Sequence, residues 1–234
     1  MFAIYKKEMR NYFTTPVGYA FIAVFLAVSG FLFAVSTFQS QTSDVSGFFQ
    51  LMIFGYIVLV PLLTMRSFAE ERRTRTEQLL MTSPLPIFKM VMAKFLSSYT
   101  LFVLALGTSC VYFIPLSTYG TMNAARTFGC LVAMLLVGMC FVAVGIFISS
   151  LTENTVTAAV GTIAVILVMV AASMFNSLID FYPVRLVLSW ISVYGRYSYF
   201  TYGMFDFSAL VYYVSLTVVF LFLTVRVFDR RRWA

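Results

Sequence analysis

The sequence predicts an all-α integral membrane protein with six transmembrane helices. Hydrophobic residues make up 61% of the chain and charged residues only 11%, against roughly 25% charged residues in an ordinary soluble domain. Most charges gather in residues 6–10, 66–94 and 226–232, which leaves long neutral stretches between them. A helix needs about 20 apolar residues to cross the hydrocarbon layer, and these stretches are long enough.

Six neutral stretches reach the length of a span. They are Asn11–Ser43, Val45–Met65, Phe95–Ala125, Thr127–Thr152, Asn154–Ile179 and Phe207–Val225. Little chain remains outside them, so we expect one membrane domain over residues 1–234 and no separate soluble domain. Outer-membrane strands do not fit, because they would alternate apolar and polar residues in segments of about ten.

The positions of Lys and Arg predict how the spans are oriented, because these residues gather in cytoplasmic loops. Of 16 Lys and Arg residues, only Arg126, Arg185 and Arg196 fall on the side opposite the chain ends. We therefore expect both termini in the cytoplasm. The net charge of +7 is then a topology signal, and no nucleic acid is expected as a partner.

Residues 1–15 are expected to form an amphipathic helix that lies in the membrane interface. Lys6, Lys7, Glu8 and Arg10 occupy the polar face, from which basic groups can approach anionic headgroups. The apolar stripe consists of Phe2, Tyr5, Met9, Tyr12 and Phe13. A bend into the first span is expected before Pro16, because proline disfavours helical geometry in the preceding residue. A simple anchor without a mechanical role explains the pattern equally well.

Residues 66–94 are expected to form a cytoplasmic segment between the second and third spans. Its first part, residues 66–77, mixes acidic and basic residues and is expected to continue the second span as a solvated helix. Leu79 and Leu80 follow as an apolar knob. A loop that only sets orientation would not need acidic residues, so we interpret this segment as a docking helix for a cytoplasmic partner.

Residues 179–206, between the fifth and sixth spans, are rich in aromatic side chains. We expect short helices that re-enter the outer interface, where Trp and Tyr are favoured. A gate over a transport path and an ordinary aromatic belt explain this composition equally well. The candidate gate residues are Tyr194, Tyr197, Tyr199, Phe200 and Tyr202.

The sequence offers no candidate catalytic or metal-binding residues. Histidine is absent, which removes the commonest general base. No G-x-x-x-x-G-K-[ST] motif occurs, so we do not expect this chain to bind ATP through a P-loop or to be an enzyme. Cys110, Cys130 and Cys140 all fall in predicted spans and are expected to be small buried residues, not disulfide or metal partners.

Five motifs are spread along the chain. They are Lys7-Glu8 with Thr15-Pro16 and Gly18-Tyr19, then Thr64–Arg72 (TMRSFAEER), Arg75–Pro84 (RTEQLLMTSP), Gly145–Asn154 (GIFISSLTEN), and Gly203–Asp206 with Leu210–Tyr213. Together they resemble the permease subunits of ABC-2 type transporters, and most closely those of the gliding-motility type. Arg75 stands where that family usually has Gly, and Arg196 and Tyr202 stand where histidine and arginine are common.

The resemblance implies the permease of an ATP-driven exporter in the bacterial inner membrane. Two permeases, identical or paralogous, would pair and bind two separate ABC ATP-binding subunits that hold ATP and Mg; an auxiliary subunit is a further expected partner. The residues assigned to ATPase coupling are Ser67, Phe68, Glu70, Glu71, Arg72, Arg73, Glu77, Leu79, Leu80 and Glu153. The alternative is a non-transporting scaffold or anchor for a cytoplasmic protein.

Overall fold

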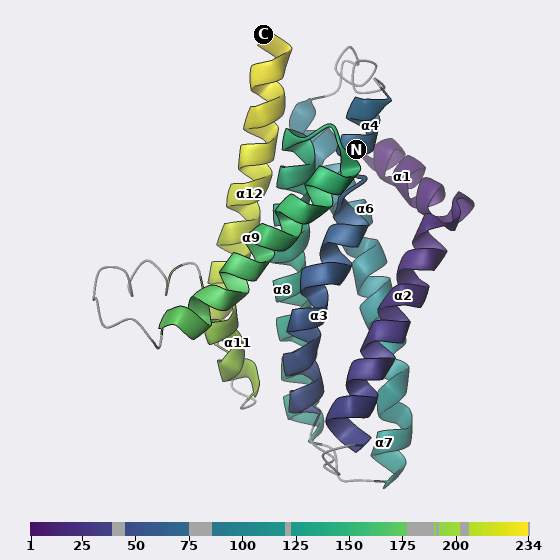
Figure 1. Cartoon of the computed structure of the whole chain (residues 1–234), viewed down its shortest axis with the longest axis vertical. Coiled ribbons are helices and arrows are strands. Elements are labelled where there is room, and N and C mark those ends of the chain that lie inside the picture. Colours follow the sequence, from purple (N-terminus) through teal and green to yellow (C-terminus); the bar gives the residue numbers. More distant parts are fainter. Residues whose placement is uncertain are drawn as a thin grey trace.

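The computed structural model describes residues 1–38, 45–74, 86–119, 123–176, 190, 192–201 and 206–233. Every regular element in these ranges is a helix (Figure 1). Six of the described helices are long and apolar enough to cross a membrane. The predicted fold class and the predicted number of spans are therefore confirmed.

The helices follow one another in a simple order. The N-terminal helix α1 (Phe2–Thr14) leads into α2 (Pro16–Phe33), the first span, which the short π-helix η1 (Ala34–Phe38) extends. The second span is α3 (Ser46–Thr64), followed by the short α4 (Ala69–Arg73). The third is α6 (Ile87–Ser109), continued by η2 (Cys110–Tyr112) and α7 (Phe113–Tyr119). The last three are α8 (Ala124–Leu151), α9 (Thr155–Asn176) and α12 (Phe207–Trp233), with α11 (Tyr194–Thr201) before α12.

The helical spans extend past the ends predicted from charge. The third span was expected to start at Phe95, but α6 starts at Ile87 and so includes Lys89 and Lys94. The sixth was expected to end at Val225, but α12 continues to Trp233. A charge marks where a helix leaves hydrocarbon and not where it ends, because long basic side chains can reach toward the interface from within a helix.

Helix α8 is the central element of the bundle. It packs against α3, α4, α6, α9, α11 and α12, and Cys130 and Cys140 are buried on it as expected. Two of its glycines allow close approach: a Cβ at Gly138 would lie 2.2 Å from the Phe102 ring, and one at Gly145 would lie 2.1 Å from the Thr64 hydroxyl oxygen. Small residues of this kind let membrane helices pack with their backbones close together.

The predicted bend between the N-terminal helix and the first span is present. Thr15 is extended, with φ −93° and ψ 153°, and Pro16 starts α2. At the inner side of the bend, a Cβ at Gly18 would lie 2.5 Å from the Tyr12 carbonyl oxygen. The chain can therefore turn this tightly only with glycine at position 18, and α1 runs sideways from the bundle axis (Figure 1).

Both ends of the chain lie at the same end of the bundle (Figure 1). The short α4 and the turn between α8 and α9 lie at that end too, whereas α7 lies at the opposite end. An even number of spans requires this arrangement. The cytoplasmic location of this end stays a prediction from the Lys and Arg distribution.

Candidate functional site

The candidate site is the end of the bundle where α1, α4, the α8–α9 turn and the last turns of α12 meet (Figure 1). Sequence reasoning assigned segment 66–94 and the distant residue Glu153 to this end. The structure brings the described parts of both together, since α4 packs against α8 and α9.

Residues 66–77 were expected to continue the second span as a solvated helix, and this is wrong for the part that the structure describes. The regular α-helix ends at Thr64, residues 65–68 form turns, and α4 starts at Ala69. Ser67 and Phe68 are buried. The Phe68 ring packs against Phe228 of α12, with ring centroids 4.7 Å apart. One aromatic side chain, Phe68, therefore attaches this segment to α12, although most of the neighbouring residues are charged.

Ser149 of α8 caps α4 from a neighbouring helix. The hydroxyl Oγ of Ser149 accepts hydrogen bonds from the backbone N–H groups of Phe68 and Ala69, both at 3.1 Å. The same hydroxyl donates to the carbonyl of Met65 at 3.2 Å. The first N–H groups of a helix need acceptors, and no side chain of α4 itself caps its start. Sequence reasoning missed this role, because Ser149 lies about 80 residues from α4 in the sequence.

Lys94 belongs to the third span and is buried against the N-terminal helix and α4, with only 2% of its side chain exposed. Its ammonium Nζ lies 2.8 Å from Glu71 Oε1 and 3.2 Å from Glu8 Oε1, and donates to the carbonyl of Ser67 at 2.8 Å. The Phe68 ring lies 5.0 Å from the same ammonium. A buried charge is tolerated only when it is paired and hydrogen-bonded, and here two carboxylates and one carbonyl surround it.

The N-terminal helix packs on the third span through three side chains. The Tyr5 hydroxyl donates to Thr100 Oγ1 at 3.2 Å, and the hydroxyls of Tyr12 and Ser98 lie 3.1 Å apart. Glu8 lies between these contacts and pairs with Lys94, so its placement on the polar face was wrong. Burial raises the pKa of the Tyr12 phenol, which keeps this hydroxyl neutral and able to hydrogen-bond.

The α8–α9 turn is joined to α4 and α12 by two arginines. Arg72 Nη2 lies 2.7 Å from Glu153 Oε1, and Arg72 Nη1 donates to the carbonyl of Leu151 at 3.3 Å. Arg231 of α12 donates to the carbonyl of Ser150 at 2.7 Å. Glu153 is 66% exposed, and ion pairs of this kind contribute little stability. The pair therefore links α4 to the turn but adds little to stability.

The predicted coupling residues that the structure describes thus divide into three groups. Ser67, Phe68 and Glu71 face the interior of the bundle, whereas Glu70 and Arg73 are exposed on α4. Arg72 and Glu153 lie together at the rim. Glu77, Leu79 and Leu80 lie outside the described residues. The part of the segment that is open to a partner, as far as the chain is described, is the outer face of α4 together with Glu153.

The predicted gate residues lie at the other end of the bundle. Tyr197 and Phe200 are fully buried, and α11 packs against α8 and α9. The Tyr194 ring contacts the rings of Tyr197 and Phe54, at 6.4 and 6.1 Å between centroids. Burial raises the pKa of the Tyr197 phenol. The face shared by Tyr194, Tyr197 and Phe200 therefore packs against this chain's own spans; the Tyr199 side chain and Tyr202 lie outside the described residues.

Comparison with known proteins identifies the chain at the level of its family. A model of the family described as "ABC-2 family transporter protein" matches residues 33–228. No curated protein matches the chain. The matched residues contain all of α3 to α11 and most of α12, and therefore include α4, the α8–α9 turn and the buried Lys94.

Proposed function

Because the chain belongs to the ABC-2 family of transporter proteins, and is thus the permease component of an ABC transporter, we propose that α4 and the α8–α9 turn receive the force of ATP hydrolysis from an ATP-binding subunit. Permeases of this family generally work with such a subunit. The outer face of α4, with Glu70 and Arg73, would be the contact surface, and Glu153 would extend it.

The observation that supports this proposal is the two-sided character of α4. Its outer face is exposed and charged, whereas its inner side is bound to three different spans. Phe68 holds it to α12, Ser149 holds it to α8, and Lys94 holds Glu71 to α6. A displacement of α4 by a partner would therefore act on all three spans together. An isolated solvated loop could not transmit such a displacement.

The further assignments follow the resemblance and the charge distribution. Two permeases would pair, with ATP and Mg held by two ATP-binding subunits, and the complex would work as an exporter in the inner membrane of a bacterium. The termini would be cytoplasmic, by the Lys and Arg count. The motifs Thr64–Arg72 and Gly145–Asn154 favour the gliding-motility type within the family. At the outer end, α11 would serve as a gate by moving with α8 and α9.

The experiment that tests the docking surface is a charge reversal on α4. The double variant Glu70→Lys/Arg73→Glu is purified with the ATP-binding subunit, and complex formation and ATPase rate are measured in liposomes. We expect weaker complex formation with normal membrane insertion, since mismatched charges at an interface cost several kcal/mol. Arg230→Glu, a charge change at an exposed position of α12 at the same end of the bundle, is the control for effects that are not specific to α4.

Unchanged complex formation and an unchanged ATPase rate in the double variant would remove α4 from the docking surface. A transport measurement distinguishes a permease from a non-transporting scaffold. A scaffold would bind the cytoplasmic partner through α4 without any solute crossing the liposome membrane, whereas a permease moves solute when ATP is added.

A further inference from the structure

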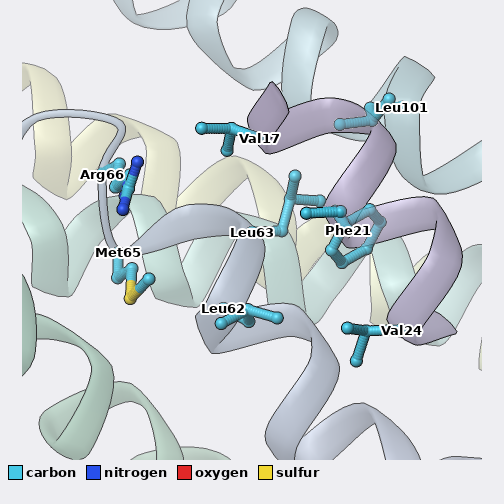
Figure 2. Close-up of a pocket in the computed structure, with 9 residues that line it drawn as sticks. Val17, Phe21, Val24, Leu62, Leu63, Met65, Arg66 and Leu101 are labelled. Atoms are coloured by element: carbon cyan, nitrogen blue, oxygen red, sulfur yellow. The ribbon is translucent and has the colours of Figure 1, made fainter. Parts of the chain in front are cut away.

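A groove between the first and second spans reaches the start of the coupling segment at Met65 and Arg66. Its volume is about 270 Å³. Val17, Phe21 and Val24 of α2 face Leu62 and Leu63 of α3 across it (Figure 2). The remaining lining residues are Ala20, Met65, Arg66 and Leu101.

The groove is apolar along its length and open at its side. Phe21, Leu63 and Leu101 are buried beneath it, whereas Val24 and Leu62 are 42% and 39% exposed. From Val17 to Val24 it follows two turns of α2, or roughly 10 Å along the helix axis. That length lies within one leaflet, because the whole hydrocarbon layer is about 30 Å thick. An apolar groove of this length, with Val24 and Leu62 exposed along its open side, fits a hydrocarbon chain.

One end of the groove carries a positive charge. Arg66 follows the end of α3 and lines the groove, on the opposite side of Figure 2 from Val24. It is exposed, and within the described part of the chain its guanidinium forms no salt bridge. Lys6, Lys7 and Arg10 are also exposed, on the helix that leads into α2. The charge therefore lies at the end of the groove that faces the headgroups.

We propose that this groove binds one anionic phospholipid of the leaflet next to α1. The phosphate is held by Arg66, whose planar guanidinium suits bidentate contact with phosphate oxygens. One acyl chain lies against Val24 and Leu62. Basic pockets between spans on the cytoplasmic side are known lipid headgroup sites in membrane proteins. Lipid binding in this groove goes beyond the proposed permease function.

The test uses the full chain in nanodiscs containing phosphatidylglycerol and phosphatidylcholine with identical acyl chains. Lipid retained after transfer to detergent is measured by native mass spectrometry. We expect the wild type to retain phosphatidylglycerol preferentially. Arg66→Gln should lower that preference about fivefold, the effect of losing one basic group near the headgroups. Arg230→Gln, an exposed arginine on α12, should leave it unchanged.

A second variant tests the apolar part of the groove. Val24→Trp fills it and should lower retention of both lipids, whereas Val58→Trp, at an exposed position on α3 outside the groove, should not. Equal retention of the two lipids by the wild type would overturn the proposal, as would unaltered preference in Arg66→Gln. Loss of permease pairing in Val24→Trp with unchanged lipid retention would assign the groove to a second copy of the chain. If a variant fails to insert, the retention of phosphatidylglycerol relative to phosphatidylcholine by the wild type still tests the proposal.

Discussion

Lys94 Nζ and Glu71 Oε1 lie 2.8 Å apart, so the segment that follows the second span is bound to the third span inside the protein. Glu8 shares the same ammonium from the N-terminal helix. One buried lysine therefore determines where three elements meet. The cluster has one more carboxylate than it has ammonium groups, which makes Lys94 the member that cannot be removed without leaving like charges together.

We expect Lys94→Met to destabilise the protein by about 3–5 kcal/mol, the cost of breaking a buried pair by removing one partner. The methionine keeps the apolar volume but leaves Glu8 and Glu71 facing each other. Thermal unfolding in detergent measures the change. Adding Glu8→Gln and Glu71→Gln should restore part of the loss, and Lys89→Met, an exposed position on α6, should have little effect. If Lys89→Met and Lys94→Met lower the unfolding temperature equally, the buried cluster does not stabilise the protein more than an exposed lysine does.

Ser149→Ala should loosen the start of α4. The substitution removes the acceptor of two backbone N–H groups, and loss of a helix cap costs about 1 kcal/mol. Hydrogen exchange should therefore become faster at the amides of Phe68 and Ala69. Ser150→Ala is the control, because the Ser150 hydroxyl donates within its own helix, to Phe147. Equal exchange rates in the two variants would mean that α4 does not depend on Ser149.

Gly145→Ala should destabilise the contact between the second and fourth spans by about 1–3 kcal/mol, a typical cost of overpacking. The added Cβ would lie 2.1 Å from the Thr64 hydroxyl oxygen and 2.8 Å from its Cβ. Thr64→Gly in the same chain should relieve the clash. Gly107→Ala provides the comparison, since a Cβ there meets nothing within 4 Å. The midpoint of thermal unfolding should fall for the first variant only.

Both termini should be inaccessible from outside the cell. On a background without cysteines, Arg230→Cys should remain unlabelled by an impermeant thiol reagent added to intact cells, and should react after the membrane is opened. The reason is the concentration of Lys and Arg at that end of the bundle. Labelling in intact cells would show that the predicted orientation is wrong and that α4 lies on the outer side of the membrane.

Hydropathy and charge were enough to predict the six spans, and Pro16 predicted the bend before it; the grouping of Glu153 with segment 66–94 came from the family resemblance. Hydropathy and charge did not predict that Glu8 and Lys94 pair in a buried cluster: Glu8 was placed on the polar face of the N-terminal helix and Lys94 at the end of the cytoplasmic segment. The reason is physical: an ionisable side chain is buried when a partner of opposite charge comes to it, and that partner can lie far away in the sequence. The same holds for Ser149, whose hydroxyl caps a helix on a different span.

The contacts of the N-terminal helix set an order of events during synthesis. Tyr5 and Glu8 are made early, yet Thr100 and Lys94, their partners, follow 95 and 86 residues later. At translation rates of about 5–20 residues per second, the ribosome needs on the order of 5–20 s to make this stretch. During that time the first helix has its contacts with α2, but its partners on the third span do not yet exist. It reaches its native position only when the third span inserts, so the earliest helix to be made is held in place by a later one.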